Sequence, residues 1–75
     1  MKKIEIEWID SNANPNEWEY LDGLEPLKPP ICRSVGFLIE ETPEYKTIVH
    51  TISTTQILGR ITIPKRCIKK VKLLR

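Results

Sequence analysis

The sequence is poor in the residues on which enzyme active sites and metal centres depend. It has one histidine, three glycines and two cysteines among 75 residues. Cys32 and Cys67, even with His50, fall short of the four ligands of a structural zinc site. There is no glycine-rich phosphate loop, no second histidine to pair with a nucleophile, and no carboxylate pair that spacing singles out. The sequence therefore predicts a protein that is not an enzyme and that uses no metal or cofactor.

Long apolar runs are also missing. No segment approaches the roughly 18 apolar residues of a membrane span, and the first strand-like residues alternate Ile with Glu where a signal peptide would be continuously apolar. We therefore expect a cytoplasmic protein with reduced thiols and no membrane partner. The length predicts a single domain, residues 1–75, with a marginal core. Because such a core needs support, we expect a homo-oligomer.

Acidic residues are absent from the second part of the chain. All ten lie between Glu5 and Glu44, against four basic residues in that part, which gives a net charge of −6. Residues 46–75 hold eight basic residues and no acidic one, a net charge of +8. A basic region of this kind attracts nucleic acid and other phosphates, so a phosphate-bearing ligand is one interpretation.

Strand-like alternation of apolar and polar residues dominates the chain. Gly36, inside the longest such segment, often marks a bulge, a bend or the close approach of another backbone or a ligand, and here it predicts a bend, with approach of a ligand as the alternative. Pro64 ends a later segment and favours a one-turn helix over residues 65–67. The sequence therefore predicts an all-β fold. The expected strands are residues 3–10, 31–42, 45–53, 60–63 and 70–73.

The run from Gly59 to Val71, GRITIPKRCIKKV, resembles the end of a Src-homology-3 barrel. In that fold a glycine-led strand ends in proline, a one-turn helix follows, and a hydrophobic pair begins the closing strand. The resemblance implies a small five-stranded barrel with its longest loop between the first two strands. Cys67 stands where signalling members carry a tyrosine that binds polyproline, so the resemblance does not extend to polyproline binding.

The barrel resemblance also offers a structural reason for some of the charges. It implies that the first and last strands pair antiparallel, with Glu5 and Glu7 opposite Lys70 and Lys72 on the outer face. Cross-strand ion pairs of this kind contribute a few tenths of a kcal/mol up to about 1 kcal/mol each and help to fix register. On this interpretation those lysines are structural and are not ligand contacts.

A second resemblance covers most of the chain. The segments WIDS, CRSVGFLIEE and IPKRCIKKV, at residues 8–11, 32–41 and 63–71, resemble a group of small phage and prophage proteins. The resemblance implies a phage or prophage setting and a compact β domain. It assigns no catalytic or binding role to any residue.

Residues 11–30 separate the first two expected strands and contain four prolines. Asn14 and Pro15 favour the start of a short helix, so this segment is expected to be either a long loop or a loop with a short helix. Trp18 and Tyr20 are aromatic residues that can stack on a base, clamp a peptide or cap a pocket. The alternative is that Trp18 folds down over an open end of the barrel.

In residues 45–53 neither face is plainly polar. Ile48 and His50 share one face, while Tyr45 shares the other with Thr47. We expect one face to pack inside the barrel and the other to meet a neighbouring subunit. His50 is then a hydrogen-bonded core or interface residue, with a ligand contact as the alternative. The candidate ligand or partner contacts are Trp18, Tyr20, Arg33, Tyr45, His50, Arg60, Lys65 and Arg66.

Two functions fit these features. The first is a non-catalytic phage or prophage accessory protein that is oligomeric and sequesters a small phosphate-bearing host signal of nucleotide type. The second is an interaction module of the same fold that binds a host protein or single-stranded RNA, with nucleic acid the less favoured partner. A structural part of the virion is a third.

Overall fold

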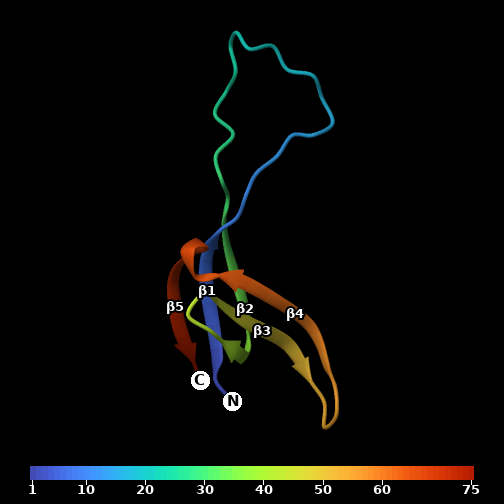
Figure 1. Cartoon of the computed structure of the whole chain (residues 1–75), viewed down its shortest axis with the longest axis vertical. Helices are drawn as coiled ribbons and strands as arrows, with labels where there is room; N and C mark the ends of the chain where they lie inside the picture. The colour runs from blue at the N-terminus through green and yellow to red at the C-terminus, as the bar shows by residue number, and fades with distance from the viewer.

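The computed structural model describes all 75 residues as a single antiparallel sheet with one long loop (Figure 1). The strands lie in the order β4-β3-β2-β1-β5, and a three-residue helix, η1 (Lys65–Cys67), precedes the last of them. The all-β prediction is confirmed, and so is the one-turn helix. The strands are β1 Lys3–Ile9, β2 Ile31–Glu41, β3 Tyr45–Ile52, β4 Ile57–Pro64 and β5 Ile68–Leu74.

The sheet is not closed, because β4 and β5 are both edge strands. A closed barrel is therefore not confirmed. The sheet is nevertheless strongly curved (Figure 1), and Gly36 of β2 is part of the reason. Gly36 is buried, and a Cβ atom at this position would lie 2.8 Å from the carbonyl oxygen of Val49 in β3. The absence of a side chain at Gly36 lets the β3 backbone approach β2 closely, as the sequence suggested.

The core is small and formed mainly by isoleucine. Ile4 and Ile6 alternate onto the same face of β1 and pack with Ile48 and Ile63 in one buried cluster. Trp8, on the same face of β1, packs against this cluster. Only seven of the 75 residues are buried, so the loss of any one large core side chain removes much of the apolar contact that stabilises the sheet.

The predicted pairing of the first and last strands is confirmed. Glu5 lies opposite Lys72 and Glu7 opposite Lys70 in the antiparallel register of β1 and β5. The register shifts between Glu7 and Trp8, since Trp8 lies opposite Ile68. One extra residue of β5, Lys69, is therefore accommodated as a β-bulge.

Residues 11–30, which we call the arm, form an extended loop that leads away from the sheet (Figure 1). The Asp10 amide donates to the Pro30 carbonyl at 3.0 Å, and Asn12 Nδ2 donates to the Lys28 carbonyl at 2.9 Å, so the two ends of the arm are joined at its base. The short helix that Asn14 and Pro15 favoured is not formed. A short helix without a face to pack on is unstable in water, and the arm packs on nothing in this chain.

The arm gives the molecule an elongated shape. Its longest extent is 54 Å against 23 Å in the other two directions, and the radius of gyration is 16.2 Å. A compact domain of this length has a radius of gyration of about 11 Å. No helix in the chain has the length and the hydropathy needed to cross a bilayer.

Candidate functional site

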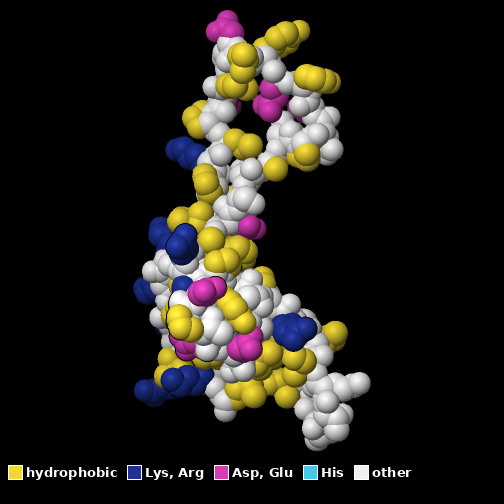
Figure 2. Space-filling model, viewed as in Figure 1, with side chains coloured by type: hydrophobic (Ala, Val, Ile, Leu, Met, Phe, Trp, Pro, Cys, Tyr) yellow, Lys and Arg dark blue, Asp and Glu magenta, His cyan; other side chains and the backbone are white.

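The most exposed apolar side chains of the molecule lie on the arm. Trp18 is fully exposed, and Tyr20 and Leu21 are each 90% exposed. In the space-filling view, hydrophobic side chains are spaced along the arm well away from the sheet (Figure 2). The alternative in which Trp18 folds down over the sheet is therefore wrong, because the base of the arm directs the chain outward. Trp18 and Tyr20 therefore project away from the rest of the chain.

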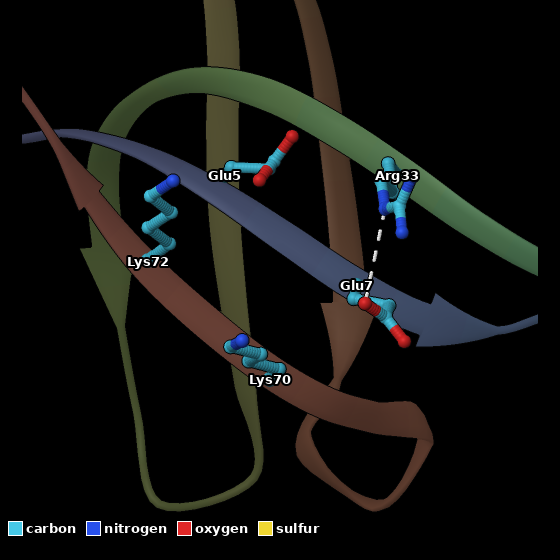
Figure 3. Close-up of a pocket in the computed structure, with 5 residues that line it drawn as sticks. All are labelled: Glu5, Glu7, Arg33, Lys70 and Lys72. Atoms are coloured by element: carbon cyan, nitrogen blue, oxygen red, sulfur yellow. Dashed lines mark ion pairs between the residues drawn. The ribbon is translucent and has the colours of Figure 1, made fainter.

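A group of five charged side chains surrounds a hollow of about 200 Å³ on the outer face of the sheet (Figure 3). Lys70 and Lys72 come from β5, on one side of β1, and Arg33 comes from β2, on the other. Between them lie Glu5 and Glu7, and Arg33 Nε is 3.8 Å from Glu7 Oε2. The two carboxylates offset most of the positive charge of this group. Arg33 is therefore paired with Glu7 and is less available to an anionic ligand.

Glu41 at the end of β2 is the centre of the strongest ion-pair network. Its Oε2 atom accepts from Lys46 Nζ and lies 3.0 Å from Lys65 Nζ. The hydrogen bond from Lys46, followed by that from Lys65, lowers the pKa of Glu41 from 4.5 to about 2. Lys65 is also fixed through its backbone, because its amide donates to the Glu44 carbonyl at 2.8 Å. Lys65, a predicted ligand contact, therefore holds η1 to the turn between β2 and β3.

Tyr45 lies beside this network, opposite Pro64 in the register of β3 and β4. The negative charge of Glu40 raises the pKa of Tyr45 above its ordinary value, and partial burial and a hydrogen bond with Glu40 act in the same direction. The phenol therefore stays protonated and can donate a hydrogen bond throughout the physiological pH range.

His50 is exposed in the single chain, so its expected place in the core is wrong, whereas its place in an interface between subunits stays a prediction. Burial along β3 includes Thr47, Ile48 and Val49 and stops there, because β3 and β4 continue as a hairpin beyond the core (Figure 1). The expected hydrogen bond is present, between His50 Nδ1 and Thr51 Oγ1 at 2.6 Å. The ring lies over Gly59 of β4, where a Cβ atom would come within 1.8 Å of His50 Cδ2.

Arg60 and Arg66 are exposed, and neither forms an ion pair within the chain. Arg60 belongs to β4 and lies opposite Val49 of β3, and Arg66 lies in η1. Strand alternation places Arg60 and His50 on opposite faces of the β3–β4 hairpin. Among the predicted basic contacts, these two arginines are the ones whose charge no carboxylate of the same chain offsets.

The eight predicted contact residues do not form one site. They lie on the arm, on the outer face near β1, around the turn between β2 and β3, and on the β3–β4 hairpin. Sequence reasoning missed Glu41, although the Thr-Pro-Glu turn that follows it predicts a hairpin in which Glu41 faces Lys46. It also missed how far the arm extends, for which the chain carries no local signal.

Comparison with known proteins adds no relative. No model of a protein family matches the sequence, and no curated protein and no solved structure matches it either.

Proposed function

We propose that this chain is a non-catalytic accessory protein of a phage or prophage that acts by binding. It assembles into an oligomer and holds a small phosphate-bearing ligand, a host signal of nucleotide type, at or near the contacts between subunits. The observation that carries this proposal is the exposure of Trp18, Tyr20 and Leu21 on an arm that extends away from the sheet. Aromatic side chains held this far from the core contribute nothing to the packing of their own chain, and such side chains are common anchors in binding surfaces.

The phosphate-bearing ligand is inferred from the basic residues. Arg60 is exposed and free of carboxylate partners, and guanidinium groups bind phosphate oxygens in a bidentate manner. A planar base needs a stacking surface, which Trp18 or Tyr20 of a second subunit would supply. The ligand would then be held by two chains, so binding and assembly would be linked.

The barrel assignment supports the same picture. A Src-homology-3-like arrangement accounts for the antiparallel pairing of β1 with β5, for the one-turn helix between β4 and β5, and for the long loop after β1. In this interpretation the molecule is a half-open member of that class, and a second subunit covers its open edges. The fold alone assigns no ligand.

Two measurements test this function. Light scattering gives the molar mass, which we expect to be a multiple of the 8.7 kDa of one chain. Calorimetry against a panel of cyclic and ADP-ribose-derived nucleotides should give heat with at least one of them, and that heat should be lost in Arg60→Ala. A Lys2→Ala variant, altered at an exposed basic residue near the N-terminus, should bind as the wild type does. Flat titrations with the whole panel would remove the nucleotide from the proposal.

A second function is favoured by the spacing of the arm aromatics. Trp18 and Tyr20 are both exposed and are separated by one residue, as in surfaces that clamp a peptide or stack successive bases. The alternative is therefore a module that binds a host protein or single-stranded RNA. A salt-sensitive shift of labelled RNA that is lost in Trp18→Ala would favour RNA. Absence of both an RNA shift and a recovered protein partner would exclude this second function.

A further inference from the structure

The arm is an acidic segment whose charges have no partners in its own chain. Four acidic residues and one lysine give it a net charge of −3, and none of the four carboxylates forms an ion pair. Exposed apolar side chains alternate with these acids along the chain. The acids are Glu17, Glu19, Asp22 and Glu25, and the apolar residues between or beside them are Trp18, Tyr20, Leu21 and Leu24.

The β5 side of the sheet has the opposite character. Lys70 and Lys72 face Glu7 and Glu5 across the β1–β5 register, and so their charges are offset within the chain. Three other basic residues of this region are exposed and form no ion pair. They are Arg66 in η1, Lys69 at the bulge of β5 and Arg75 after the last strand.

β5 also has exposed apolar side chains, on the face that carries Ile4 and Ile6 in β1, and an unpaired strand edge. Val71 is 41% exposed and Leu73 is 64% exposed on β5. Because β5 pairs only with β1, the backbone N–H and C=O groups of its other edge have no sheet partner. Open edges of this kind are where a further chain segment adds to a sheet.

The two surfaces cannot meet within one chain in this arrangement. The arm is joined at its base by the contacts between Asp10 and Pro30 and between Asn12 and Lys28, and it extends away from β5 (Figure 1). In a two-fold dimer, by contrast, the arm of each copy can reach the β5 side of the other, and both contacts form at once. Three unpaired cations spread along η1 and β5 then meet the excess acid of the arm.

We infer that the occupant of the β5 side is the arm of a second copy of this chain. The arm acids bind Arg66, Lys69 and Arg75, while Trp18 and Leu21 cover the exposed apolar side chains of β5. This inference rests on the oligomeric function proposed above and deepens it, because it names the two surfaces that join the subunits.

Reversal of charge on each surface tests the inference with the full chain. The arm variant carries Glu17→Lys, Glu19→Lys and Asp22→Lys. The β5 variant carries Arg66→Glu, Lys69→Glu and Arg75→Glu. All six positions are exposed in the isolated chain, so circular dichroism should show that the sheet is retained in both variants. Light scattering in about 0.1 M salt, where the Debye length is about 10 Å, then gives the molar masses.

We expect wild type to have at least twice the mass of one chain and each variant alone to fall to the monomer mass. An equimolar mixture of the two variants should regain the wild-type mass, because each reversed surface then faces its complement. Glu44→Lys and Lys2→Glu, which reverse exposed charges elsewhere, should keep the wild-type mass. If wild type is a monomer, the oligomeric function itself fails. If wild type is an oligomer but the arm variant keeps its mass, or if the mixture stays monomeric, this inference alone is overturned.

Discussion

Glu41 and Lys65 form an ion pair of 3.0 Å that joins the end of β2 to the one-turn helix before β5. Lys46 donates to the same carboxylate oxygen, so one side chain connects β2, β3 and η1. This network lies where the chain turns from β4 into β5. It therefore helps to set the path of β5 toward its pairing with β1.

Replacement of Glu41 by glutamine should make stability less dependent on pH in the acid range. The folded-state pKa of Glu41 is lowered from 4.5 to about 2. A carboxyl group with a lowered pKa in the folded state contributes stability that is fully present above the unfolded pKa and is lost as pH falls through the folded value. The wild-type free energy of unfolding should therefore fall more steeply between pH 4.5 and pH 2 than that of Glu41→Gln. Urea unfolding across this range measures both slopes.

Glu44→Gln is the matched control for that experiment. Glu44 is exposed on the adjacent turn and forms no ion pair. Its variant should follow the wild-type curve. Equal slopes for wild type and Glu41→Gln would contradict the role given to the Glu41 network.

Gly36→Ala should destabilise the sheet by about 1 to 3 kcal/mol, the usual cost of forcing an extra methyl group into a packed site. The added Cβ would lie 2.8 Å from the Val49 carbonyl oxygen and 3.2 Å from Ile48 Cβ, so β3 would have to move away from β2. Gly23→Asn is the control, because nothing lies near Gly23 and asparagine tolerates its φ of +81°. Thermal and urea unfolding measure the stability of both variants. A Gly36→Ala variant as stable as the wild type would show that β2 and β3 are not packed closely at this position.

His50 and Gly59 should behave as a coupled pair. A side chain at Gly59 meets the His50 ring and also has an unfavourable backbone conformation, since φ is +81°. Gly59→Ala should therefore be destabilising, and His50→Ala should relieve the steric part of that loss and leave the backbone part. A double-mutant cycle on unfolding free energies should give a coupling of about 0.5 to 3 kcal/mol. If the effects of the two substitutions on the free energy of unfolding are additive, the His50 ring does not lie over Gly59.

Ile6→Ala should remove a large part of the free energy of unfolding. Ile6 is completely buried at the centre of the cluster, and a large-to-small change at such a site costs about 2 to 5 kcal/mol. A domain of this length has a total stability of roughly 4 to 11 kcal/mol. Leu58→Ala, at a β4 side chain that is 65% exposed, should change the unfolding free energy little. The urea midpoints of the two variants are compared at one protein concentration. Similar losses of stability in both would show that Ile6 is not part of the core.

Much of the fold follows from local patterns in the sequence. Alternation of Ile with Glu in β1 fixes which face of that strand is buried, and Pro64 ends β4. The same kind of alternation in β5 predicts a strand, but its Val71 and Leu73 stay exposed. The pairing of these two strands was implied by the resemblance to the barrel, and the opposite charges of Glu5 and Glu7 and of Lys70 and Lys72 agree with it. Local patterns do not predict that the sheet stays open or that His50 is exposed. Alternation places His50 in line with Ile48, but the core ends between them, and that is a property of the tertiary structure.

The candidate site was less predictable. The composition of the arm predicts Trp18 and Tyr20 as candidate contacts. The direction in which the arm leaves the sheet depends on hydrogen bonds between residues far apart in the sequence, such as that between Asn12 and Lys28. Lys65 looked like a free cation because its partner, Glu41, lies on another strand. Charges that are paired only through the fold cannot be separated from free ones by counting residues.

The measurement that tests the central claim most directly is the molar mass of wild type beside that of a variant with Trp18→Ser and Leu21→Ser. Light scattering should give wild type a multiple of 8.7 kDa and the variant 8.7 kDa, with the same circular dichroism spectrum for both. The arm would then be the element that joins subunits. A wild type that stays at 8.7 kDa at every concentration, or a variant that keeps the wild-type mass, would contradict it.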